Sequence, residues 1–165
     1  MKFTTLILVL AATTTALMAG VFYAFSCSVN PGLGRQSDTA YISAFQSINR
    51  AIQNPVFFVV FMGAPLLLLL STWLHYRQPT SLRFWFLLAA SAVYFAGGLG
   101  VTVFGNIPLN EQLDSFNLLS ASADEIARQR ARFEGPWNRL NTIRTLACTL
   151  AVVLLIMACL SPDEK

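Results

Sequence analysis

The fold is decided by a stretch without a charged residue, which reads AIQNPVFFVVFMGAPLLLLLSTWLHY at residues 51–76. Three further stretches lack Asp, Glu, Lys and Arg, at residues 3–34, 84–110 and 145–162. An apolar helix of about 20 residues crosses a bilayer and satisfies its own backbone hydrogen bonds. The sequence therefore predicts an all-α membrane protein, a single domain over residues 1–165 with four transmembrane helices in a bundle. The predicted helices lie near residues 4–29, 55–75, 83–104 and 142–160.

The composition agrees with a membrane location. Of the 165 residues, 55% are hydrophobic and 12% are charged, whereas a soluble domain carries roughly 25% charged residues. This excludes an ordinary cytosolic enzyme, a disordered chain and a disulfide-stapled secreted domain. The formal net charge is +3. Basic residues of membrane proteins usually lie in loops beside lipid headgroups, so we expect membrane lipids and no nucleic acid as partners.

Proline, glycine and asparagine mark the predicted helix boundaries. The sequence Asn30-Pro31-Gly32 predicts the end of the first helix, because the residue before proline is disfavoured in the helical region. Asn54-Pro55 predicts an N-cap and a first helical residue for the second helix. The segment 105–108 predicts the end of the third helix, and Gly135-Pro136 precedes the approach to the fourth.

The two long loops are each predicted to contain an amphipathic helix. In the first, apolar residues recur at helical spacing after the cap candidates Ser37 and Asp38, a pattern of helices that lie on or dip into the membrane interface. In the second, Ser122 and Glu125 form a capping box. Its charge run predicts a solvated helix face, and no chemistry is assigned to its arginines, Arg128, Arg130 and Arg132.

Small residues and one proline bear on helix packing. Residues 12, 16, 20 and 24 of the first helix are all Ala or Gly, as are residues 92, 96 and 100 of the third. Such stripes let helices approach closely in lipid, so helices 1 and 3 are predicted neighbours. Pro65 lies midway along helix 2, where it is either a tolerated kink or a means of opening space for a ligand.

The polar residues gather on one membrane face. With four helices and two long loops, the ends of helices 1 and 3 share a side with the starts of helices 2 and 4. That side carries Asn30, Gln46, Asn49, Asn54, Asn106, Asn110, Glu111, Trp137, Asn138, Asn141 and Arg144. Capping explains Asn54, and turns explain Asn30 and Asn106. Harder to explain structurally are Gln46, Asn49, Asn110 and Asn141.

One stripe of helix 4 combines Trp137, Asn141, Arg144 and Cys148 at helical spacing. Arg144 has two interpretations. It either snorkels to the headgroups or faces the bundle interior, as intramembrane charges generally do. His75 is the only histidine and has no partner ligand nearby in sequence, so an interfacial residue is favoured over a metal or haem ligand. No nucleotide, P-loop or nucleophile motif occurs, and we expect neither metal nor cofactor.

Four motifs, placed in order along the four helices, resemble those of the anthrone oxygenase-like family. They are Asn30-Pro31-Gly32-Leu33, Phe45-Gln46-x-x-Asn49, Asn106-Ile107-Pro108-Leu109-Asn110 and Trp137-Asn138-x-Leu140-Asn141-x-x-Arg144-Thr145. The resemblance implies a four-helix integral membrane protein. Some fungal members of this family are associated with the oxidation of an anthrone to an anthraquinone by molecular oxygen without an evident cofactor.

The residues can be tested against that chemistry, which needs an apolar pocket, a deprotonation and stabilisation of the resulting anion. We assign the catalytic roles to Arg144, Asn141, Asn110 and Asn49, with the guanidinium stabilising an anion. We assign the binding of a planar aromatic substrate to Trp137, Tyr23, Asn30 and Gln46. We expect the catalytic residues and Trp137 to form one polar cluster at the mouth of an apolar cavity.

Two questions stay open from the sequence. Glu111 is the carboxylate beside the asparagine motif, and it is either a general base or a helix N-terminal acid stabilised by the dipole. The whole polar face is either an oxygenase site or a non-enzymatic site that binds a lipid, a quinone or a partner protein. For the location we predict a plasma or inner membrane, with both termini and His75 in the cytoplasm.

Overall fold

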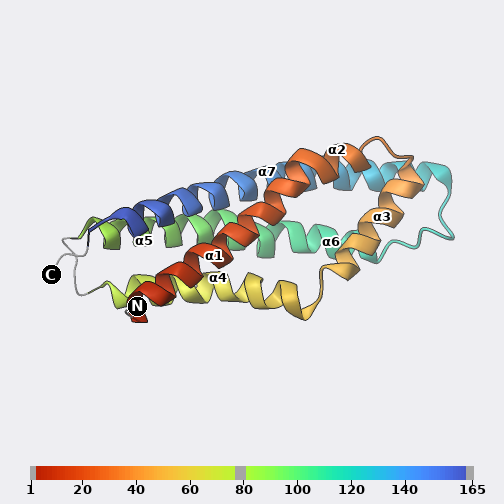
Figure 1. Cartoon of the computed structure of the whole chain (residues 1–165). Coiled ribbons are helices and arrows are strands. Elements are labelled where there is room, and N and C mark those ends of the chain that lie inside the picture. The colour runs from red at the N-terminus through yellow and green to blue at the C-terminus, as the bar shows by residue number, and fades with distance from the viewer. Residues whose placement is uncertain (1–2, 77–80, 163–165) are drawn as a thin grey trace.

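The computed structural model describes residues 3–76 and 81–162, and the regular elements within these ranges are all helical. Four of the helices described are long and apolar enough to cross a membrane, at Phe3–Leu33, Pro55–Leu74, Leu82–Asp114 and Ala123–Leu160. Figure 1 shows them as an elongated bundle. The four predicted spans are therefore confirmed. Most of the short connection predicted at 76–82 lies outside the described residues, together with Lys2, Arg77 and Lys165.

The first membrane helix continues through the predicted stop at Asn30-Pro31-Gly32. It consists of α1 (Phe3–Ala24), a π-helical segment η1 (Phe25–Val29) and α2 (Asn30–Leu33). The predicted boundary is wrong because Pro31 follows a π turn. Proline has no N–H for an i−4 carbonyl and its ring crowds that carbonyl, whereas π turns are wider and bond five residues back. The wide turn therefore absorbs the proline without ending the helix.

The third membrane helix repeats this arrangement. It consists of α5 (Leu82–Val93), the π-helical segments η2 (Tyr94–Gly100) and η3 (Thr102–Asn106), and α6 (Ile107–Asp114). The predicted end at residues 105–108 is wrong for the same reason, since Pro108 follows η3. The helix thus carries its asparagine motif past the predicted end.

The second membrane helix, α4 (Pro55–Leu74), begins as predicted. The Asn54 side-chain oxygen accepts a hydrogen bond from the backbone N–H of Phe57 at 3.0 Å, and Pro55 occupies the first turn. At the opposite end, the His75 ring Nδ1 lies 2.8 Å from the Ser71 carbonyl oxygen, and the side chain is buried.

The fourth helix is longer than predicted. α7 (Ala123–Leu160) runs without a break through Gly135-Pro136 and so includes the predicted helix of the second long loop. Both residues are exposed, so the carbonyl that loses its Pro136 partner lies away from the core. The capping box of Ser122 and Glu125 starts the helix, as predicted. At about 1.5 Å per residue, α7 is much longer than the roughly 30 Å hydrocarbon core, and its first half projects beyond it.

The predicted pairing of helices 1 and 3 is wrong. α1 packs against α4 and α7, and α5 packs against α7 and α4, so the first and third helices are diagonal in the bundle. Close approach occurs instead between the third and fourth helices. A Cβ atom on Gly98 would lie 2.8 Å from the Cys148 sulfur, and one on Gly97 would collide with Ala147. Gly20 of the predicted stripe faces open space.

A second hydrophobic core lies where the amphipathic helix α3 (Asp38–Ala51) packs on α6 and the first half of α7. This helix forms as predicted, with the Ser37 side chain accepting from the Ala40 N–H at 3.3 Å. Its apolar face packs against α6 and α7, and it buries Tyr41 and Phe45 against Phe133 and Trp137. Protein therefore covers much of the apolar face of α3, and its position at the membrane interface stays a prediction.

Arg130 joins α3 to α7 and is not part of a solvated face. Its guanidinium donates to the carbonyl oxygens of Gly34 at 2.9 Å and Gln36 at 2.8 Å. It also forms ion pairs with Asp38 at 2.9 Å and Glu134 at 2.8 Å. These contacts fix the corner between α2 and α3 on the first half of α7, which positions α3 over the end of the bundle.

Candidate functional site

The fold brings the predicted polar residues to one end of the molecule. Figure 1 shows α2, α3, α6, the start of α4 and the first half of α7 at this end. The start of α1, the end of α4, the start of α5 and the end of α7 lie at the other. This arrangement follows from the long first and third connections, as the sequence predicts.

A cavity of about 480 Å³ opens among these elements. Its walls come from α1 and η1, from the end of α3, from the first turns of α4, from η3 and α6, and from α7. Phe22, Phe25 and Trp137 line it on the α1 and α7 side. Phe57 and Phe61 line it from α4, with ring planes only 17° apart and centroids separated by 5.4 Å. Aromatic rings from α1, η1, α4 and α7 therefore line the cavity.

Arg144 lines this cavity and lies inside the bundle. Its residue is 6% exposed, and Nη2 donates to the Asn141 side-chain oxygen at 2.8 Å. Nη1 lies 3.4 Å from the Thr102 hydroxyl. The guanidinium carbon lies 4.3 Å from the ring centroid of Phe22 and 5.3 Å from that of Trp137. Snorkelling to the headgroups is thus the wrong interpretation.

The charge of Arg144 has no carboxylate counterpart in residues 3–76 and 81–162. Within these ranges Asp38, Asp114 and Glu134 form ion pairs with Arg50 and Arg130. Arg144 Nε has no hydrogen-bond partner there. A buried cation held only by an amide, a hydroxyl and two ring faces is costly. The cavity therefore favours an anion or an electron-rich oxygen next to Arg144.

Asn141 holds Arg144 through a closed ring of hydrogen bonds between α7 and the first membrane helix. Its Nδ2 donates to the Phe22 carbonyl oxygen at 3.1 Å and to the Ser26 hydroxyl at 2.9 Å. The Ser26 and Thr145 hydroxyls are 2.9 Å apart. Thr145 donates to the Asn141 carbonyl oxygen at 2.9 Å, so Ser26 must be the donor to Thr145. This ring fixes the Asn141 amide with its oxygen toward Arg144.

Trp137 and Asn110 meet on the cavity wall. The Trp137 indole N–H donates to the Asn110 side-chain oxygen at 2.7 Å, and both residues line the cavity. Asn106 is fully buried and its amide nitrogen lies 3.5 Å from the Trp137 carbonyl oxygen. The interpretation of Asn106 as a turn residue is therefore wrong.

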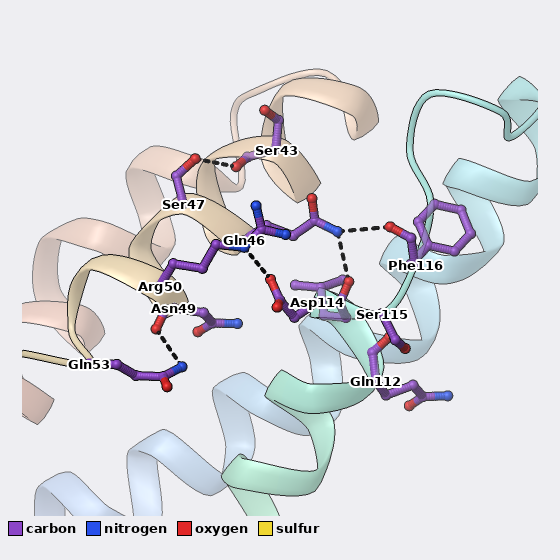
Figure 2. Close-up of polar contacts among 11 residues, drawn as sticks. Ser43, Gln46, Ser47, Asn49, Arg50, Gln53, Gln112, Asp114, Ser115 and Phe116 are labelled. Atoms are coloured by element: carbon purple, nitrogen blue, oxygen red, sulfur yellow. Dashed lines mark hydrogen bonds and ion pairs between the residues drawn. The ribbon is translucent and has the colours of Figure 1, made fainter.

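Asn49 reaches the cavity from α3. It is 6% exposed, and its side-chain nitrogen has no partner in the described residues. In Figure 2 the side-chain amide of Asn49 lies between α3 and α6 with no interaction drawn to it. The backbone carbonyl oxygen of Asn49 accepts a hydrogen bond from the Gln53 side chain at 3.1 Å. Beside it, Arg50 and Asp114 join the same two helices at 2.8 Å.

Three predicted substrate-binding residues lie elsewhere. Tyr23 is 60% exposed and does not line the cavity. Asn30 lines a separate polar recess with Ser26 and Asn138. Gln46 is buried, and its amide donates to the carbonyl oxygens of Leu113 at 2.8 Å and Phe116 at 2.9 Å. Figure 2 shows Gln46 bound at the end of α6. Gln46 does not line the cavity.

Two contributors to the site, Ser26 and Thr102, escaped sequence reasoning. Both are single hydroxyl residues within long apolar helices, where such residues often bond their own helix. Thr102 does so, donating to the Gly98 carbonyl oxygen at 2.7 Å. In the sequence, Ser26 lies at helical spacing from Tyr23 and Asn30, but that spacing does not distinguish Ser26 from these two neighbours.

The cavity rim carries Glu111, which is exposed and forms no ion pair within the described residues. Asp114 also lines the cavity but pairs with Arg50. Among the residues the structure describes, no group of three His, Cys, Asp or Glu side chains could hold a metal ion. The cavity thus offers a cation, amide groups, aromatic faces and one unpaired carboxylate.

The family model described as Anthrone oxygenase matches residues 56–154, which is more than half of the chain. The match covers α4, the third membrane helix and most of α7, and it includes Thr102, Asn110, Trp137 and Arg144. No curated protein and no solved structure matches the chain.

Proposed function

Since this chain belongs to the anthrone oxygenase family, we propose that it oxidises a hydrophobic, anthrone-like aromatic compound with molecular oxygen and without a cofactor. The observation that carries the proposal is the buried guanidinium of Arg144, which faces an aromatic cavity without a carboxylate partner in the described residues. Such a group stabilises an anion that forms during a reaction far better than it would in water.

The proposed reaction converts the central methylene of an anthrone to a carbonyl. Loss of one methylene proton gives an enolate whose charge spreads onto the ketone oxygen. Molecular oxygen then adds to the carbanion carbon, and the O–O bond of the resulting peroxide breaks as that carbon loses its second hydrogen as a proton. One oxygen atom becomes the new carbonyl, and the other leaves as water with the two methylene hydrogens. Molecular oxygen is the sole oxidant, so atoms and electrons balance.

The residues divide into an anion site and a ring site. Arg144 binds the enolate oxygen, and Asn141 holds the guanidinium in position by the 2.8 Å hydrogen bond. The rings of Phe57 and Trp137 contact the faces of the planar substrate, because offset aromatic pairs are favourable. Glu111 and water at the rim are the proton acceptors within this scheme.

Purified protein in detergent micelles, supplied with anthrone and isotopically labelled oxygen gas, tests the proposal. We expect oxygen uptake together with one labelled atom in the anthraquinone carbonyl. Loss of one stabilising donor costs about 10²–10³ in rate, so Arg144→Ala should fall toward the autoxidation rate of empty micelles. Arg139→Ala, which removes an exposed arginine from the same helix, should keep the wild-type rate.

The alternative is a non-enzymatic membrane protein that binds a quinone, a lipid or a protein partner in the same cavity. It predicts anthraquinone binding that depends on Arg144, with oxygen uptake equal to that of empty micelles. We also propose a plasma or inner membrane location with both termini in the cytoplasm, because arginines cluster about the short connection between helices 2 and 3.

A further inference from the structure

The rim of the cavity has two chemically different parts. Phe58 and Ile107 form an apolar part and are 46% and 36% exposed. Gln53, Glu111 and Ser115 form a polar part and are also exposed. Exposed apolar patches mark surfaces that contact lipid or partners, so the apolar part of the rim suits contact with lipid and the polar part suits contact with water.

The apolar part lies at the depth where the hydrocarbon core begins. The 20 residues of α4 span about 30 Å, which equals the hydrocarbon thickness. Phe58 is in the first turn of α4, so it lies within about 5 Å of the boundary. Phe104 and Val56, which are 87% and 79% exposed, are further exposed apolar residues close in sequence to Ile107 and Phe58.

The helices on either side of this rim have different neighbours. α4 packs against α1 and α5, whereas α6 packs against η3, α3 and α7. Phe57 and Phe58 of α4 and Ile107 of α6 line the cavity from these two sides. In Figure 1 α3 crosses the end of the bundle where α6 ends and α4 begins. The cavity is thus covered by α3 on its aqueous side and bounded by two separate helices on its membrane side.

We infer that the cavity takes its ligand sideways from the bilayer, between the first turn of α4 and the start of α6. The ligand is a planar aromatic molecule with one oxygenated edge. The near-parallel rings of Phe57 and Phe61 form a flat wall that suits a fused-ring system. At the inner end, Arg144 receives the oxygenated edge. This inference rests on the aromatic substrate of the proposed function, but it concerns the route and needs no turnover.

Binding kinetics of two non-reactive probes test the route. Anthraquinone dissolved in nanodisc lipid should arrive through the apolar rim, and an anthraquinone sulfonate dissolved in water should arrive through the polar rim. Quenching of Trp137 fluorescence reports both, in a background where Trp73 and Trp85 are replaced by Phe. The variant Ile107→Tyr narrows the apolar rim. Val103→Tyr makes the same change one turn earlier on the same helix, at a residue that is 40% exposed and does not line the cavity.

We expect Ile107→Tyr to slow association of the lipid-dissolved quinone by about tenfold or more, and to leave the association rate of the water-soluble sulfonate unchanged. Val103→Tyr should leave the association rates of both probes unchanged. Equal slowing of both probes, equal rates in the two variants, or no quenching by either probe would overturn the inference. A bound phospholipid that anthraquinone does not displace, seen by native mass spectrometry, would also overturn it. If oxygen uptake failed while both probes bound as expected, the oxygenase proposal would be overturned and the proposed entry of the ligand from the bilayer would still hold.

Discussion

At the scale of single residues, the site depends on which groups hold the charged guanidinium of Arg144. Asn141 offers it a dipole in place of a charge, with a 2.8 Å hydrogen bond, so the guanidinium keeps its full positive charge toward the cavity. A carboxylate at this position would form a buried ion pair and cancel that charge. Under the proposed chemistry, the amide of Asn141 leaves the charge of Arg144 available to a ligand. A nearly isosteric substitution at this position tests this role.

We predict that Asn141→Asp lowers the affinity for an anthraquinone sulfonate by about tenfold or more, because an ion pair with Arg144 competes with the ligand's negative charge. Isothermal titration of the detergent-solubilised protein measures this. Asn138→Asp is the control, since Asn138 lines the separate recess, and it should bind as the wild type does. Unchanged affinity in Asn141→Asp would show that the charge of Arg144 does not bind the ligand.

Ser26 provides a second test at this scale. Ser26→Ala removes the acceptor for Asn141 Nδ2 and the donor to Thr145, and one such hydrogen bond contributes about 1 kcal/mol. We expect a lower thermal midpoint in detergent and a reduced rate of anthrone oxidation, because Asn141 loses its orientation. Ser28→Ala, an exposed position in the same π-helical segment, should change neither quantity.

At the scale of elements, charge gaps predict the four spans because a bilayer excludes charges over about 20 residues. The ends of those spans were not predictable in the same way. Pro31 and Pro108 normally stop a helix, but the π-helical segments that precede them depend on packing against α7. The first segment also changes which residues share a face. Ser26 therefore contacts Thr145, while Tyr23, three residues earlier, is exposed.

The candidate site was predictable where topology alone decides. Asn49, Asn110, Trp137 and Arg144 line one cavity because the two long connections bring their segments to the same end. Gln46 was assigned to the substrate because its polarity at a helical spacing resembles that of a binding residue. The sequence gives no indication that the end of α6 would offer it two carbonyl oxygens, since that contact depends on how α6 continues the third helix.

The close approach of the third and fourth helices gives a prediction at this scale. Gly98→Ala places a Cβ atom 2.8 Å from the Cys148 sulfur, so the helices must separate or Cys148 must move. Overpacking of this kind costs about 1–3 kcal/mol, and we expect a lower thermal midpoint. Gly20→Ala meets nothing within 4 Å and should be neutral or slightly stabilising, because alanine favours the helix. Equal midpoints for the two variants would contradict this packing.

At the scale of the whole molecule, the protein has two hydrophobic cores. The membrane helices form one around residues such as Leu68, Leu87 and Leu155. The second core lies between α3, α6 and the first half of α7 and is built on Tyr41 and Phe45. The cavity lies where they meet, since Phe22 belongs to the first core and Trp137 to the second. A site between the two cores joins an apolar space for rings to a polar end that carries Arg144.

The orientation of the whole molecule decides which leaflet this cavity faces. A raw count of basic residues favours the long connections as cytoplasmic. In the structure, however, Arg144 is buried in the bundle, and Arg50 and Arg130 pair with acids within the folded end. The short connection between the second and third helices keeps an arginine at each end, at positions 77 and 83. The positive-inside rule is strongest for short loops.

We therefore predict that His75 and both termini are cytoplasmic, and that the cavity opens toward the opposite leaflet. A C-terminal alkaline phosphatase fusion should be inactive, and a C-terminal fluorescent-protein fusion should be bright, because each reporter works on one side of the membrane. A single cysteine in place of the exposed Ser120, with the native cysteines changed to Ser, should react with a membrane-impermeant maleimide in intact cells. An active phosphatase fusion, with Ser120→Cys labelled only after lysis, would place the cavity at the cytoplasmic leaflet instead.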